Sequence, residues 1–95
     1  MENEIIRAEI IAIGFVQGVG FRHFVYQNAI SIGVTGYVKN LYSGEVLTVA
    51  EGERYKLEEL YKKIKVGPSY CRVNKVTIEY LPAKNEFKTF EVRYV

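Results

Sequence analysis

An arginine that follows a run of glycines is the first feature of this sequence that could do chemistry. Residues 14–22 read GFVQGVGFR, with an arginine, Arg22, as the last letter. Glycine is costly in a regular helix or strand, but it lets successive backbone amides turn toward one centre. The planar guanidinium of Arg22 could then bind two oxygens of a phosphate group. The segment therefore predicts an anion site.

The elements expected on either side of this segment favour the same chemistry. Residues 5–13 are rich in isoleucine, with Arg7 and Glu9 on the polar side, and are typical of a strand. Residues 21–32 carry apolar side chains at helical spacing. Amides at a helix N-terminus lack partners inside the helix, and the helix dipole attracts anions there. A glycine turn that merely connects strand to helix fits these residues equally well.

Two common phosphate-binding motifs do not fit. A P-loop needs Lys-Ser or Lys-Thr behind its glycines, and the dinucleotide fingerprint needs a glycine where this chain has His23. Taken separately, Arg22 is also compatible with a solvated helix residue, and Asn40 with a residue flanking a hairpin turn. The anion-site interpretation is favoured if the two side chains meet in space, which their spacing does not decide.

The remaining pattern predicts a small layered fold. Further strands are expected at 34–40, 45–51, 73–81 and 87–95, and a second amphipathic helix through 57–64. Gly33 and the Gly-Pro pair at 67–68 are suited to ending the helices. The order β-α-β-β-α-β plus an edge strand predicts the ferredoxin-like α+β sandwich, an antiparallel sheet with two helices on one face. Many functions share this fold.

Composition limits the function classes. The 95 residues predict a single domain over 1–95. A net charge of +2, with acids interleaved among the bases, argues against nucleic acid and membrane partners. One cysteine, Cys71, excludes an intrachain disulfide, and a lone His23 excludes most metal and histidine-based schemes. No membrane-length apolar run or signal-peptide pattern is present, so we expect a monomeric cytoplasmic protein.

Two blocks of the sequence resemble the acylphosphatase family. The first is GFVQGVGFR at 14–22, and the second starts with GYVKN at 36–40 and continues through Gly44, Val46 and Gly52. The similarity extends through VAEG at 49–52, GP at 67–68 and FEVRY at 90–94, so it covers nearly the whole chain. The resemblance implies the ferredoxin-like fold and hydrolysis of acyl phosphates to a carboxylate and inorganic phosphate.

The resemblance also implies roles for individual residues. Arg22 binds the phosphate together with loop amides contributed by Val16, Gln17, Gly18, Val19, Gly20 and Phe21. Asn40 positions the attacking water, and no metal or organic cofactor is needed. Phe15 and Leu41 depart from the commoner pattern, in which many members have a polar or basic residue at the first position and some have a hydroxyl residue at the second.

This small set of groups suffices for an acyl phosphate. The carboxylate leaving group has a low pKa, so no general acid is required. The phosphoryl transition state is loose and spreads its charge over three oxygens, which makes positioning and electrostatics the main needs. Asn40 can accept a hydrogen bond from water and donate one to substrate. Since no strong base stands in these blocks, we expect a substrate oxygen to take the proton of the water.

Other interpretations were weighed against this one. Residues 18–26, GVGFRHFVY, superficially resemble the aromatic motif of RNA-binding RRM domains, but that motif lies on a third strand and not at a helix start. His23 could be a base, yet its position on the helix turns it about 100° from Arg22. Acylphosphatase-like domains also occur inside carbamoyl-transfer maturation enzymes. A phosphate- or carbamoyl-phosphate-binding module with weak turnover is therefore the alternative, although we expect this chain to stand alone.

Overall fold

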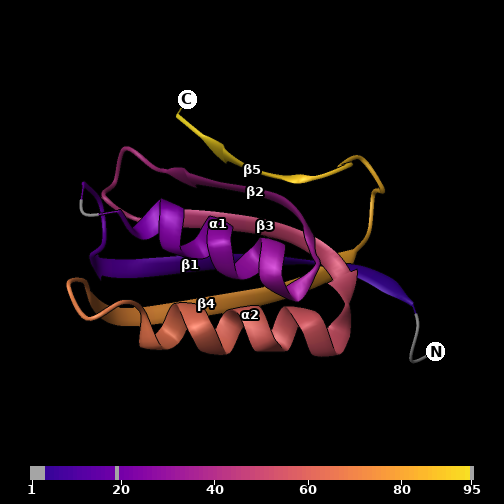
Figure 1. Cartoon of the computed structure of the whole chain (residues 1–95), viewed down its shortest axis with the longest axis horizontal. Coiled ribbons are helices and arrows are strands. Elements are labelled where there is room, and N and C mark those ends of the chain that lie inside the picture. Colours follow the sequence, from indigo (N-terminus) through magenta and orange to yellow (C-terminus); the bar gives the residue numbers. More distant parts are fainter. Residues whose placement is uncertain (1–3, 19, 95) are drawn as a thin grey trace.

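The computed structural model describes residues 4–18 and 20–94 of the chain (Figure 1). In this part of the chain the elements follow the expected order, with bounds that differ from the expected ones by a few residues. They are β1 (Ile5–Phe15), α1 (Phe21–Ile32), β2 (Thr35–Asn40), β3 (Val46–Glu53), α2 (Arg54–Val66), β4 (Arg72–Pro82) and β5 (Phe90–Arg93).

The strands form one sheet in the order β4-β1-β3-β2-β5. The pairs β1·β3, β1·β4 and β2·β3 are antiparallel, as the fold prediction requires. The last strand, β5, pairs with β2 in parallel, so the sheet is mixed and not antiparallel throughout. The cause is visible in Figure 1: the chain leaves β4 and enters β5 at the same end of the sheet, after crossing from one edge to the other.

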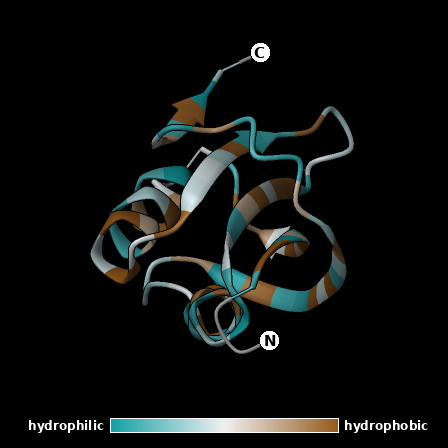
Figure 2. Cartoon of the chain, turned by 90° about the vertical axis from the view of Figure 1, so that its right-hand side faces the viewer, coloured by the Kyte–Doolittle hydropathy of each residue, from teal (hydrophilic) through white to brown (hydrophobic). Residues whose placement is uncertain are grey.

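Both helices pack on one face of the sheet (Figures 1 and 2). Their buried side chains recur at helical spacing and meet the alternate residues that the strands turn toward them. The core is built from Phe21, Val25 and Ala29 of α1, Leu57, Leu60 and Ile64 of α2, and Ala8, Ile10 and Ala12 of β1. Gly33 ends α1 in the left-handed conformation, with φ of 97°, and donates its amide to Ala29 O. Neither helix has the length and apolar character to span a membrane.

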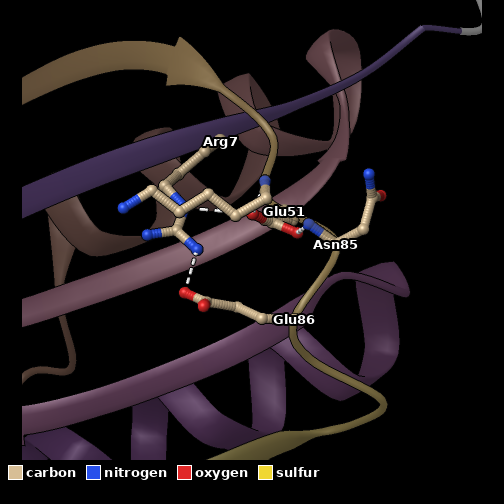
Figure 3. A network of polar contacts seen from close by, with 5 residues as sticks. Arg7, Glu51, Asn85 and Glu86 are labelled. Carbon is tan, nitrogen blue, oxygen red and sulfur yellow. Dashed lines mark hydrogen bonds and ion pairs between the residues drawn. The ribbon is translucent and has the colours of Figure 1, made fainter.

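The other face of the sheet carries a buried polar network (Figure 3). Arg7 and Glu51 lie opposite each other on β1 and β3, only 6% and 3% exposed. Arg7 Nε donates to Glu51 at 3.0 Å, and another guanidinium nitrogen donates to Glu86. The backbone amides of Lys84 and Asn85 donate to the same Glu51 carboxylate at 2.8 and 3.1 Å. The network therefore fastens the β4–β5 connection to the sheet and fixes the path by which β5 reaches its edge.

Opposite charges in this network stabilise each other. Burial by itself lowers the pKa of Arg7, but the hydrogen bonds to Glu86 and Glu51 outweigh burial and raise that pKa above its ordinary value. The Arg7 hydrogen bond lowers the pKa of Glu86. Arg7 is consequently a structural cation, because its positive charge is paired with carboxylates of the same chain.

Candidate active site

The loop between β1 and α1 is shaped by two glycines. Gly18 and Gly20 have φ of 75° and 81°, the left-handed region that residues with a β-carbon disfavour. A β-carbon added at Gly18 would meet no atom within 4 Å, so the backbone angle and not a lack of space calls for glycine there. Gly20 caps α1 without a side-chain hydrogen bond, and the first turn of α1 has no acidic residue. The helix N-terminus is thus accessible to an external anion.

Three described amides of this loop are available to bind such an anion. Those of Gln17, Gly18 and Gly20 donate to no group within residues 4–18 and 20–94. Val16 and Phe21, each 1% exposed, anchor the two ends of the loop in the core. Val19, also predicted to bind substrate, lies outside the described residues.

A cavity of about 220 Å³ lies between this loop, β2 and the end of the chain. Its lining comprises Val16, Gly18, Gly20, Phe21, Arg22, His23, Asn40, Val92 and Tyr94. Arg22 and Asn40, which spacing alone could not bring together, therefore face one space. Since a water molecule occupies about 30 Å³, the cavity has room for a phosphoryl group and a water.

Arg22 is half-buried in the first turn of α1 and has uncharged contacts. Its Nη1 donates to Arg93 O at 3.1 Å, and its guanidinium carbon lies 4.5 Å from the centre of the Tyr94 ring. None of the carboxylates in the described parts of the chain forms an ion pair with it. A guanidinium carries five N–H donors, so most of them remain for an anion.

Asn40 is the last residue of β2, where it pairs with Val46 of β3. Its Oδ1 is buried and has no hydrogen-bond partner among the described residues. An unpaired buried carbonyl costs about 1–3 kcal/mol, and native structures contain few of them. Asn40 also lines the cavity, and an O–H donor such as water is a chemically suitable partner for this acceptor.

Gln17 contributes a contact that sequence reasoning missed. Its side-chain Nε2 donates to Leu41 O at 2.8 Å and to Glu45 O at 2.9 Å. Both carbonyls belong to the turn that follows Asn40. A glutamine in a glycine loop gives no sign of its partners when they lie more than 20 residues along the chain.

Sequence reasoning also placed no site residue on the last strand. Val92 and Tyr94 line the cavity, and Arg93 supplies the carbonyl that holds Arg22. The alternation of Phe90, Val92 and Tyr94 was a usable signal that they share a face. Only the parallel pairing of β5 with β2 brings that face to Asn40.

Three further positions complete the surroundings of the cavity. His23 is exposed and stacks on Tyr26 with ring centres 6.2 Å apart, and it also lines the cavity. Phe15 is 63% exposed and does not line the cavity. Leu41 lines a second hollow of about 360 Å³, which adjoins the first at Asn40 and Tyr94.

The single cysteine lies apart from the cavity. Cys71 is half-buried before β4, and burial raises the pKa of its thiol, which makes it a poor nucleophile at neutral pH. Among residues 4–18 and 20–94, no three His, Cys, Asp or Glu side chains gather where they could hold a metal ion. The polar groups that line the cavity include Arg22, Asn40 and His23.

Comparison with known proteins agrees with this fold and indicates a family. The acylphosphatase family model matches residues 8–92. The acylphosphatase of Syntrophotalea carbinolica is 46% identical over 89 residues, which cover 94% of this chain and 97% of that protein. The crystal structure of acylphosphatase from Bacillus subtilis is similar with a TM-score of 0.89 and 31% identity, over 94% of this chain and 99% of that one.

The same fold also occurs as a small part of a larger protein. The crystal structure of full-length HypF in the phosphate- and nucleotide-bound form is similar with a TM-score of 0.84 and 29% identity, over 96% of this chain and 12% of that one. The ferredoxin-like fold is confirmed by these structures. With a family match across nearly its whole length, the chain belongs to the acylphosphatase family.

Proposed function

We propose that this chain hydrolyses the carboxyl-phosphate bond of acyl phosphates by direct attack of a positioned water, acting as a single domain over 1–95. The observation that carries the proposal is the shared cavity. It joins an arginine whose described contacts are uncharged to an asparagine whose buried Oδ1 has no partner among the described residues. Arg22 and Asn40 are the catalytic residues.

Arg22 and the loop amides bind the phosphoryl group. The Arg93 carbonyl and the Tyr94 ring orient the guanidinium without neutralising it, so its charge is available to a dianion. Amides from Val16 to Phe21 at the start of α1 add neutral donors and the positive end of the helix dipole. These groups match the charge that the loose transition state spreads over the equatorial oxygens.

Asn40 holds the attacking water. Its buried Oδ1 accepts a hydrogen bond from the water and so aims an oxygen lone pair at phosphorus. The new oxygen–phosphorus bond forms as the bond from phosphorus to the acyl oxygen breaks, and that electron pair leaves with the carboxylate. The proton of the water passes to a phosphoryl oxygen. No general acid is needed, because the carboxylate leaves as a weak base.

The proposal is tested by inorganic phosphate release from benzoyl phosphate. Wild type should turn over, and Arg22→Ala should lose about a hundredfold or more in kcat/KM, since it removes the cation of the site. Arg54→Ala is the matched control, because Arg54 is exposed and lies outside the cavity. Equal rates for wild type and Arg22→Ala would contradict the assignment.

The alternative is a phosphate- or carbamoyl-phosphate-binding module with weak turnover. The similarity to a small part of HypF is the observation behind it. The chain is more similar to acylphosphatases, which it covers almost completely, and this favours the hydrolase. Phosphate binding by calorimetry, without release of phosphate from acetyl or benzoyl phosphate, would support the module instead.

We further propose that the enzyme is a cytoplasmic monomer that acts on small molecules and binds neither nucleic acid nor membrane. The modest net charge of +2 and the single cysteine support this setting. Sedimentation velocity of the purified protein should give one species of about 10.9 kDa. A dimer at micromolar concentration would contradict the monomer.

A further inference from the structure

We propose that Gln17 is a positioning residue: its side-chain amide ties the phosphate-binding loop to the turn after Asn40 and so sets the distance between phosphoryl group and water. The inference rests on the proposed function of Arg22 and Asn40. It concerns the side chain of Gln17, whereas the family resemblance implies a role for its backbone amide alone.

The contact uses both hydrogens of the Gln17 carboxamide. Nε2 donates one to Leu41 O at 2.8 Å and the other to Glu45 O at 2.9 Å. Both bonds have good length, and the side chain is half-buried. Gln17 therefore holds two points of the 41–45 turn at once, which fixes its place more firmly than one bond could.

Among the described residues, no other hydrogen bond joins this turn to the loop. Its own bonds run from Leu41 N to Glu45 O at 2.8 Å and from Gly44 N to Leu41 O at 3.1 Å, so they close the turn on itself. The residues between, 42–44, are exposed. Gln17 thus supplies the link between this turn and the other half of the cavity.

Asn40 immediately precedes the turn and is the last residue of β2 that pairs with β3, so a shift of the turn moves the strand end that carries it. Its Oδ1 has no partner among the described residues that would fix it independently. The phosphoryl group is held from the other side of the cavity by the loop that carries Gln17 itself. A misplacement of about 1 Å between reacting groups can cost about a hundredfold in rate. The two hydrogen bonds from the Gln17 side chain, called the clamp below, therefore affect the chemical step through geometry, without touching the reacting atoms.

Substitutions at Gln17 should separate kcat from phosphate binding. Gln17→Ala keeps the backbone amide but removes the clamp, so we expect kcat on benzoyl phosphate to fall about tenfold while the inhibition constant of inorganic phosphate changes less than about twofold. Gln17→Glu has the same shape but turns a carboxylate oxygen toward two carbonyls, and it should lower kcat further. Gln27→Ala, the exposed second glutamine of the chain, is the matched control.

A double-mutant cycle with Asn40→Ala tests whether Gln17 acts through Asn40. In that background Gln17→Ala should lower kcat less than about twofold, because the residue that the clamp positions is already absent. A full tenfold loss there, or a phosphate inhibition constant that rises as much as kcat falls, would overturn the inference.

Gln17→Asn, which keeps the amide on a shorter arm, repeats the cycle if Gln17→Ala melts below the assay temperature. Unchanged kcat in a turning-over enzyme refutes the clamp alone, whereas absent wild-type turnover refutes the proposed function.

Discussion

Two arginines of this small protein, Arg7 and Arg22, differ in the charge of the groups that surround them. Arg7, on the sheet face away from the helices, is buried between the carboxylates of Glu51 and Glu86. Arg22, on the helix side, touches a backbone carbonyl and an aromatic ring. Neutral partners orient a guanidinium and leave its positive charge for a ligand, whereas carboxylate partners neutralise that charge. In this protein the charge of the partners, more than burial, therefore separates the arginine of the buried network from the arginine proposed to bind the phosphoryl group.

Breaking the Arg7 network should have the largest effect on stability. Glu51→Gln turns an amide toward Arg7 and two backbone N–H donors, so we expect the free energy of unfolding to fall by about 3–5 kcal/mol. Urea denaturation measures this loss. Glu58→Gln is the control, because its ion pair with Arg54 at 3.4 Å is exposed and should change stability by less than about 0.5 kcal/mol. Similar losses for both variants would remove the distinction between the two kinds of ion pair.

Changing Arg22 should reverse that pattern. Arg22→Lys keeps the positive charge but loses the planar fork of donors, so kcat/KM on benzoyl phosphate should fall about a hundredfold. The free energy of unfolding should change by less than about 1 kcal/mol, since the residue gives up one hydrogen bond to a carbonyl. Steady-state kinetics and urea denaturation of the same preparation check both parts. A lysine variant with full activity would show that charge alone suffices.

Asn40 should show a trade between stability and activity. Asn40→Ala removes a buried oxygen that lacks a partner among the described residues, so the protein should gain about 1 kcal/mol of stability. Activity should move the other way, with kcat falling about tenfold or more and phosphate inhibition little changed. Thermal unfolding and inhibition kinetics measure the two changes. A variant that is both less stable and fully active would contradict the role assigned to Asn40.

The smallest expected effect is a pH dependence at Glu86. Its hydrogen bond from Arg7 lowers the pKa of Glu86 below the ordinary value of 4.5. Stability from this group is therefore complete above that ordinary pKa and is lost as pH falls through the lowered one. Glu86→Gln should make the decline of stability on the acid side shallower, measured by urea denaturation from pH 7 downward. An unchanged acid slope would show that the exposed carboxylate contributes nothing.

The elements could be predicted from the sequence where local signals define them. Gly33 and the apolar spacing predicted both ends of α1, and Gly18, Gly20 and Arg22 of the glycine segment line one cavity. Long-range pairing was out of reach. Arg7 was expected on the polar side of its strand, because nothing local shows that the β4–β5 connection covers it. The parallel entry of β5 and the clamp of Gln17 depend in the same way on segments distant along the chain.

The most direct test of the account is the fate of isotopic oxygen during hydrolysis of benzoyl phosphate in ¹⁸O-labelled water. If Arg22 holds the phosphoryl group while Asn40 directs water at phosphorus, the label enters inorganic phosphate and benzoate stays unlabelled. Mass spectrometry of both products after a short incubation shows which of them carries the label. Label in benzoate would mean that water attacks the acyl carbon, and it would contradict the proposed site.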